Sequence, residues 1–255
     1  MYPVLIKIGP LTVHTYGFLI AMGFLTALWL AMRQADRVGI PKEPVMDMAF
    51  YAIIAGLVGS RLFFVATEWA YFSANPLAIF KIWEGGLVFF GGVILAVPTA
   101  IFYLRKHGLH AWKVADLWAP SVAIGHAIGR LGCFCAGCCY GKPAEGLPWA
   151  VIFTDPASLA LKGVPLHPTQ LYESAAELIN FFVLITMRKR LRVPGQLFWL
   201  YLLNYSVIRT VVEFYRGDEI RGFITDGISI SQGISVVLFF VAGSMLLKLR
   251  GKKTS

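Results

Sequence analysis

Three arginines interrupt long apolar runs of the sequence, where a charged side chain is costly. They are Arg61, Arg130 and Arg209. A cation near the centre of a bilayer costs at least about 2.5 kcal/mol, so arginines in such runs usually mark a functional site. The guanidinium fork matches phosphate oxygens. Three guanidiniums at the same depth in a bilayer repel one another unless an anion lies between them. The pattern predicts a phosphate pocket that opens into the outer leaflet and suits an anionic phospholipid.

Nearby carboxylates leave a second explanation open. Glu213 follows Arg209 by four residues, and Glu173 begins another apolar run. The arginines would then pair with these carboxylates or extend to the membrane interface, and their role would be structural. His126 lies one turn before Arg130, and a packing role is preferred for it over a place in the pocket.

Seven apolar runs are long enough to cross about 30 Å of hydrocarbon, and these elements must position the arginines. The runs cover residues 15–32, 46–67, 88–104, 115–131, 169–187, 196–214 and 228–247. They are too uniformly apolar for surface helices and too long for the strands of a membrane barrel. With 57% hydrophobic and 15% charged residues, the 255-residue chain is also unlike a water-soluble domain. We therefore expect an all-α integral membrane protein with seven transmembrane helices in a single domain, residues 1–255.

The basic residues predict the orientation of this bundle. Fourteen lysines and arginines fall in the connections after the first, third and fifth runs and in the C-terminal tail, against six on the opposite side. By the positive-inside rule the N-terminus is outside (periplasmic) and the C-terminus is cytoplasmic. The same asymmetry explains most of the net charge of +9, so no nucleic-acid partner is expected.

Two longer connections then lie on the outer face. They cover about residues 68–87 and 132–168 and are rich in glycine, proline and aromatic residues. Long ordered loops on one face tend to carry function. The active site is therefore expected at the outer face, towards the periplasm or the cell exterior.

All four cysteines lie within seven residues: Cys133, Cys135, Cys138 and Cys139. Zinc fingers and ribbons take ligands from two separated pairs, and the adjacent Cys138 and Cys139 would be strained in one coordination shell. The preferred explanation for the four cysteines is that they are small residues that pack a tight glycine-rich loop. A disulfide is the next explanation. The sequence thus predicts no metal site and no cofactor.

The stretch 129–143, GRLGCFCAGCCYGKP, resembles the signature of the bacterial prolipoprotein diacylglyceryl transferase family. Four further segments resemble the same family in the same order: residues 14–17 (HTYG), 83–92 (WEGGLVFFGG), 167–173 (HPTQLYE) and 205–214. The resemblance extends over about residues 8–240. Each segment alone is weak, but five in order form a specific signal.

This resemblance implies an activity and its partners. Members of the family transfer the diacylglyceryl group of phosphatidylglycerol to the lipobox cysteine of preprolipoproteins. The reaction forms a thioether and releases glycerol phosphate, as the first step of lipoprotein maturation at the bacterial inner membrane. The implied partners are phosphatidylglycerol, preprolipoprotein signal peptides and membrane lipids.

The resemblance also implies roles for particular residues. Arg130 and Arg209 would clamp the phosphate and offset its developing charge, while Tyr16 and Tyr205 would orient the headgroup or relay protons. The residues expected to bind the phospholipid headgroup are Arg61, Arg130, Arg209, Gly85, Gly86, Cys133, Gly141 and His167, with Glu173 and Glu213 setting the arginine geometry.

The chain departs from the family pattern at several positions. Phe90 stands where many members have histidine or tyrosine, so a base at that position is absent. Cys133, Ala136 and Cys138 stand where many members have asparagines and a glutamate. A relative with altered or lost catalysis that binds anionic lipid therefore remains an alternative. A transporter is a weaker one, because no repeat is found and only Asp47 and Asp116 lie near the inner ends.

Overall fold

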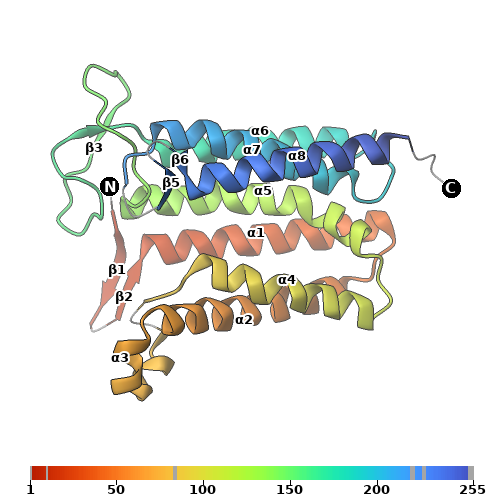
Figure 1. Cartoon of the computed structure of the whole chain (residues 1–255), viewed down its shortest axis with the longest axis horizontal. Coiled ribbons are helices and arrows are strands. Elements are labelled where there is room, and N and C mark those ends of the chain that lie inside the picture. The colour runs from red at the N-terminus through yellow and green to blue at the C-terminus, as the bar shows by residue number, and fades with distance from the viewer. Residues whose placement is uncertain (1, 10, 83–84, 219–221, 226–227, 252–255) are drawn as a thin grey trace. The chain divides into compact units, whose positions relative to one another are not determined.

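The computed structural model describes residues 2–9, 11–82, 85–218, 222–225 and 228–251. Within these ranges, seven helices of 18 residues or more occupy the seven predicted runs (Figure 1). They are α1 (Thr15–Val38), α2 (Lys42–Thr67), α4 (Phe89–Lys106), α5 (Ala111–Ala136), α6 (Thr169–Met187), α7 (Gln196–Tyr215) and α8 (Ile230–Arg250). Several helices continue past the apolar runs into polar sequence, as α1 does through Arg37. Straight-chain charged residues have good helix propensity, so a helix does not stop where its apolar stretch ends.

Four of these helices are both long and apolar enough to cross a membrane: α1, α2, α4 and α8. The prediction of a helical membrane protein is therefore confirmed at this level. The other three long helices carry polar side chains in pairs: His126 and Arg130 in α5, Glu173 and Glu177 in α6, and Arg209 and Glu213 in α7. Those side chains form the buried polar network described below.

Short elements occupy the connections. Two-stranded antiparallel hairpins form from β1 (Val4–Ile8) with β2 (Leu11–His14), from β3 (Val151–Ile152) with β4 (Pro165–Leu166), and from β5 (Phe223–Thr225) with β6 (Ile228–Ser229). The helix α3 (Trp69–Ala74) and the 3-10 helix η1 (Pro76–Phe80) lie within the segment 68–87. The strands were not predicted, because two to five residues are too few for a clear alternation of polar and apolar side chains.

The chain divides into two compact units. The first unit comprises Met1–Ala31 and Ala115–Ser255, and the second comprises Met32–Val114. In the first unit α7 packs against both α6 and α8 (Figure 1). Asp116 fixes the beginning of α7, since its carboxylate accepts hydrogen bonds from the backbone amides of Gly195 at 2.6 Å and Phe198 at 2.8 Å. These amides belong to the first turn of a helix, which has no intrahelical partner for them.

Glycines bring two helices of the first unit close together. A Cβ atom at Gly23 in α1 would lie 2.7 Å from the carbonyl oxygen of Gly125 in α5. A Cβ atom at Gly129 would lie 3.3 Å from Ile20. The Gly125–Gly129 spacing therefore serves close helix packing, as the small-residue pattern predicts.

The second unit is built on the same principle. Gly59 in α2 and Gly91 in α4 face each other so closely that a Cβ atom on either would overlap the backbone of the other. A Cβ atom at Gly92 would lie 2.5 Å from the hydroxyl of Ser60. Arg61, which follows Ser60 in α2, is thus carried on a tightly packed helix pair.

Candidate active site

Glu173 is the centre of a buried ionic network in the first unit. It lies in the first turns of α6 and its side chain is 2% exposed. Arg130 of α5 donates from Nη2 to its Oε1 at 2.8 Å, and Arg209 of α7 donates from Nη1 to its Oε2 at 3.4 Å. Two of the three predicted arginines therefore meet around one carboxylate, which separates their positive charges.

Arg130 has further partners on its own helix. Its Nε donates to Nε2 of His126 at 3.2 Å, and its Nη1 approaches the sulfur of Cys133 at 3.8 Å. Together with Glu173, these partners use three of the five N–H donors of the guanidinium. The side chain is 14% exposed, so its other donors can reach a ligand.

Arg209 is held from three helices. In addition to Glu173, it contacts Glu213 one turn along α7, with Nη2 3.0 Å from Oε2. Its Nη2 also donates to the hydroxyl of Ser231 in α8 at 3.1 Å. Because Glu213 is 1% exposed, the pair is fixed inside the bundle. The predicted pairing of Glu173 and Glu213 with arginines is therefore present.

The ionic network continues into the loop after α7. Arg216 lies 3.9 Å from Oε2 of Glu213 through its Nε, and the same Nε donates to Oδ1 of Asp218 at 2.8 Å. Arg216 is buried. Arg216 is one of the six basic residues predicted on the outer face, and nothing in its spacing separates it from an ordinary loop residue.

His126 and Glu177 extend the network towards the middle of the bundle. His126 Nε2 lies 3.5 Å from Glu173, and its Nδ1 lies 3.7 Å from Glu177, which is fully buried. Asn180 donates to Glu177 at 3.3 Å. His126 therefore contacts Glu173 and Glu177 of a neighbouring helix and Arg130 of its own helix, which makes the ring a member of the network. The spacing of four residues between His126 and Arg130 was the sequence signal for this contact.

Both predicted tyrosines lie beside the network. Tyr205 is one turn before Arg209, and its ring centroid is 5.8 Å from that of His126. Tyr16 lies in the first turn of α1, and a Cβ atom at Gly132 would lie 3.4 Å from its ring. Gly132 lies between Arg130 and Cys133 in sequence, so Tyr16 is placed next to the end of α5.

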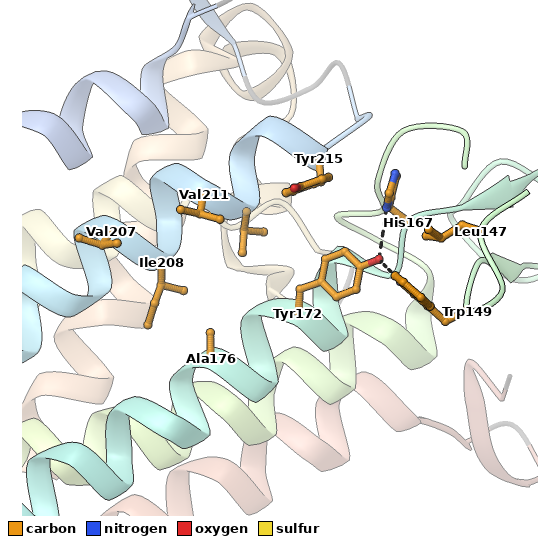
Figure 2. A pocket seen from close by; sticks show the side chains of 10 residues that line it. Leu147, Trp149, His167, Tyr172, Ala176, Val207, Ile208, Val211 and Tyr215 are labelled. Carbon is orange, nitrogen blue, oxygen red and sulfur yellow. Dashed lines mark hydrogen bonds between the residues drawn. The ribbon is translucent and has the colours of Figure 1, made fainter. Parts of the chain in front are cut away.

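An apolar pocket of about 690 Å³ opens between α6, α7 and the loop that precedes α6 (Figure 2). Its walls include Val207, Ile208 and Val211 of α7 and Ala176 of α6, with aromatic side chains at one end (Figure 2). There Tyr172 accepts a hydrogen bond from Trp149 Nε1 at 2.8 Å, and its hydroxyl lies 3.2 Å from Nδ1 of His167. The predicted site residue His167 therefore lines this pocket.

Gly141 makes the loop next to this pocket tight. Its amide donates to the carbonyl of His167 at 3.0 Å. A Cβ atom here would lie 2.5 Å from His167 and 2.8 Å from the carbonyl oxygen of Tyr215. Only glycine fits between these two backbone segments, so Gly141 positions His167 rather than offering a functional group.

The last turn of α5 and the loop after it bring three thiols together. Gly137, with φ of +76°, reverses the chain, and the amide of Cys138 donates back to the carbonyl of Cys133 at 3.1 Å. This arrangement is a Schellman C-cap, which requires a left-handed residue at that position. The sulfur atoms of Cys133, Cys138 and Cys139 consequently lie within 4.8 Å of one another. Cys139 has φ of +58° and is the one non-glycine residue with positive φ in the described ranges. A backbone of this kind costs about 1–3 kcal/mol and is found mostly at functional sites.

The three thiols also hydrogen-bond to one another. Hydrogen bonds from the thiols of Cys133 and Cys138, together with the charges of Arg130 and Arg216, lower the pKa of the Cys139 thiol below its usual range. The pKa of the Cys138 thiol is raised, since it hydrogen-bonds to the other two sulfurs and is partly buried. The cluster therefore shifts the pKa values of these two thiols in opposite directions. Its convergence was missed because the spacing differs from that of two separated cysteine pairs.

Arg61 belongs to the second unit, where its partners are backbone carbonyls. Its five N–H donors point to five carbonyl oxygens, at 2.6 to 3.2 Å, those of Ala78, Ile79, Lys81, Gly85 and Gly86. The guanidinium also lies 5.3 Å from the ring of Phe72. These contacts tie the connection between α2 and α4 to α2. Arg61, Gly85 and Gly86 thus come together, lining a small cavity of about 130 Å³.

These features define a class of protein. It is a helical membrane protein that keeps a buried arginine–carboxylate network beside an apolar pocket, which is the combination expected of a protein that handles an anionic lipid. The sequence profile of the prolipoprotein diacylglyceryl transferase family matches residues 3–248. The chain belongs to this family.

Individual relatives can be aligned with almost the whole chain. A protein of Geobacillus kaustophilus is 37% identical over 257 aligned residues, and one of Bacillus licheniformis is 36% identical; each alignment covers 98% of this chain and 93% of the relative. A protein of Staphylococcus haemolyticus is 35% identical and is covered to 89%. All three are named phosphatidylglycerol–prolipoprotein diacylglyceryl transferase. The resemblance stated from the sequence motifs is confirmed.

Proposed function

We propose that this chain transfers the diacylglyceryl group of phosphatidylglycerol to the lipobox cysteine of prolipoproteins. Membership of the family and the names of the relatives support this reaction. One observation supports assigning the reaction to particular residues. Arg130 and Arg209 both bind Glu173, and N–H donors of Arg130 are left for a ligand. The product is a thioether, and the leaving group is glycerol phosphate.

The two arginines stabilise the leaving group. A lipid phosphodiester has one negative charge, and the departing phosphate monoester gains a second as the carbon–oxygen bond breaks. Guanidinium donors placed in advance at that oxygen stabilise the transition state more than the ground state. Glu173 and Glu213 hold the guanidiniums in place before the lipid arrives, so no reorganisation is needed during the reaction.

The flanking residues orient the substrate. Tyr205 and Tyr16 each lie within one helical turn or one close contact of this network, and in the proposal they hydrogen-bond the headgroup or pass on a proton. The apolar pocket of about 690 Å³ receives hydrocarbon of the lipid, with His167 at its polar end. Cys133 and Gly141 shape the loop between the network and this pocket. The headgroup role predicted for Arg61, Gly85 and Gly86 is not part of this proposal, because all five N–H donors of Arg61 point to backbone carbonyls of the second unit.

The proposal includes the placement in the membrane. All seven long helices cross the bilayer of the bacterial inner membrane, with the N-terminus on the periplasmic side and the C-terminus in the cytoplasm. The basic loops support this orientation by the positive-inside rule. Prolipoproteins have their lipobox cysteine at the outer surface of this membrane, so substrate and site meet on the same side.

A reconstitution assay tests the function. The purified protein is mixed with phosphatidylglycerol and a lipobox peptide, and the thioether product is followed by mass. Control reactions replace the peptide cysteine by serine, or replace phosphatidylglycerol by a zwitterionic phospholipid, and neither control should give product. Failure to form product with the complete mixture would refute the proposal.

A lipid-binding relative without catalysis is the second candidate. Phe90 favours it, because phenylalanine cannot transfer a proton. Binding of phosphatidylglycerol vesicles without product would support this candidate. A transporter gains no support from Asp116, whose carboxylate caps α7, or from Asp47, which accepts a hydrogen bond from Tyr103 at 3.2 Å.

A further inference from the structure

The three converging thiols form a preformed cluster that has no role in the proposed phosphate chemistry. Cys133, Cys138 and Cys139 bring their sulfurs within 4.8 Å of one another. Two thiolates bound at 2.3 Å to one tetrahedral zinc ion lie about 3.8 Å apart, so the sulfurs need to approach by no more than about 1 Å. Thiolates select soft, thiophilic ions such as zinc. We propose that these three cysteines bind a thiophilic divalent cation of the zinc class.

The loop around these cysteines is fixed by side chains from the next helix. Thr169 donates to the carbonyl of Cys139 at 2.7 Å, and Gln170 donates to the carbonyl of Cys138 at 2.7 Å. Thr169 and Gln170 are both 1% exposed. These bonds keep Cys139 in its left-handed conformation.

The charges around the cluster also fit a metal–thiolate centre. Three thiolates with one divalent ion have a net charge of −1. Arg130 lies 3.8 Å from the sulfur of Cys133, and the charges of Arg130 and Arg216 both act on Cys139. A guanidinium next to a metal–thiolate centre neutralises the excess negative charge, as other outer-shell partners do.

A metal ion held by three cysteines would have one open coordination position, which could bind a substrate. The step described next rests on the function proposed above. Catalytic zinc sites have three protein ligands and leave the fourth position for water or substrate. A thiol that coordinates zinc loses its proton outright. The lipobox cysteine would bind there as a thiolate, with its proton released to solvent. Activation by the metal replaces the base that is missing at Phe90.

The bond changes then balance without another reactant. The metal-bound thiolate sulfur attacks the glyceryl carbon, and a carbon–sulfur bond forms as the carbon–oxygen bond to phosphate breaks. The electron pair of the broken bond leaves with glycerol phosphate, next to Arg130. The neutral thioether is a weak zinc ligand and dissociates, which reopens the fourth position.

Metal binding is tested first, without any substrate. The reduced, full-length protein in detergent is dialysed against zinc, and bound metal is measured by elemental mass spectrometry. We expect one ion per chain. The Cys138→Ser variant should lower the affinity by at least about 100-fold, because loss of an outer-shell partner alone costs 10- to 100-fold. Cys135→Ser is the matched control and should retain the ion, since Cys135 lies outside the cluster.

A second variant separates ligand loss from misfolding. Cys139→Gly removes a thiol at a residue with φ of +58°, where glycine is favoured, so this variant should fold at least as well as the wild type. It should nevertheless lose the metal. Wild-type affinity in Cys139→Gly would overturn the proposal. So would a failure of the reduced wild type to bind zinc, or a stable disulfide among the three cysteines.

The role in the reaction is tested afterwards on the same preparations. Metal-free wild type should still bind phosphatidylglycerol vesicles but form no thioether, and added zinc should restore the product. Full activity without metal would overturn the role in thiol activation. A zinc-loaded wild type that forms no product would instead refute the proposed function, while the metal measurement would still stand.

Discussion

Replacing Arg130 by lysine separates the guanidinium geometry from its charge. In the structure, Nε, Nη1 and Nη2 of Arg130 point to three different partners, and two N–H donors are left for the lipid phosphate. A lysine keeps the positive charge but has a single nitrogen, which cannot hold Glu173 and a phosphate oxygen in the same fixed geometry. Loss of one donor to a developing oxyanion lowers kcat by about 10²- to 10³-fold. We expect Arg130→Lys to lower kcat by at least about 100-fold.

The assay follows thioether formation at several concentrations of phosphatidylglycerol. Because the lost donors act mainly in the transition state, kcat should fall much more than KM rises. Arg105→Lys, an exposed arginine in the last turn of α4, is the control for the same chemical change and should leave kcat unaltered. If folded Arg130→Lys keeps kcat within about threefold of the wild type, the phosphate role assigned to the guanidinium fork is wrong.

Three further substitutions test separate parts of the structure. Glu173→Gln leaves two buried guanidiniums without their shared carboxylate, so the free energy of unfolding should fall by about 3–5 kcal/mol in a denaturation series; an unchanged value would show that the network does not stabilise the fold. Gly141→Ala places a Cβ 2.5 Å from His167 and should lower turnover by at least about tenfold, whereas Gly243→Ala, with its nearest atom at 4.0 Å, should not. Asp116→Ala removes two hydrogen bonds to the start of α7 and should cost about 1–2 kcal/mol of stability, with unchanged turnover per folded molecule; a lower turnover would contradict its purely structural role.

The helices could be predicted from the sequence because a membrane imposes a simple rule. Backbone N–H and C=O groups inside a bilayer have no water to bind, so a long apolar segment that crosses it must satisfy them within itself as a helix. The predicted run 169–187 coincides with α6, and 196–214 differs from α7 by one residue. The family was also predicted, because its motifs are short ordered strings that can be read without a structure.

The partners of the buried charges were harder to predict. The sequence placed Glu213 near Arg209 through a helical spacing of four residues, and this pair is present. The meeting of Arg130 with Glu173 joins residues 43 positions apart, and no local spacing encodes such a contact. The thiol cluster depends on a single glycine, Gly137, whose left-handed conformation turns Cys138 and Cys139 back towards Cys133. A turn of this kind can be proposed from sequence, but its result depends on what the turned chain meets.

The buried carboxylates explain how the site can keep its arginines without weakening the enzyme. Arg130 and Arg209 alone would repel each other in a medium of low dielectric constant, and a tightly bound phosphate would be the simplest remedy. Strong binding of that kind would also retain the product, glycerol phosphate, which has more negative charge than the lipid phosphodiester. Glu173 and Glu213 instead neutralise the guanidiniums within the protein, so that the ground state gains little from them. In the proposed reaction, the stabilisation by the guanidiniums is greatest at the leaving oxygen, where the second negative charge forms.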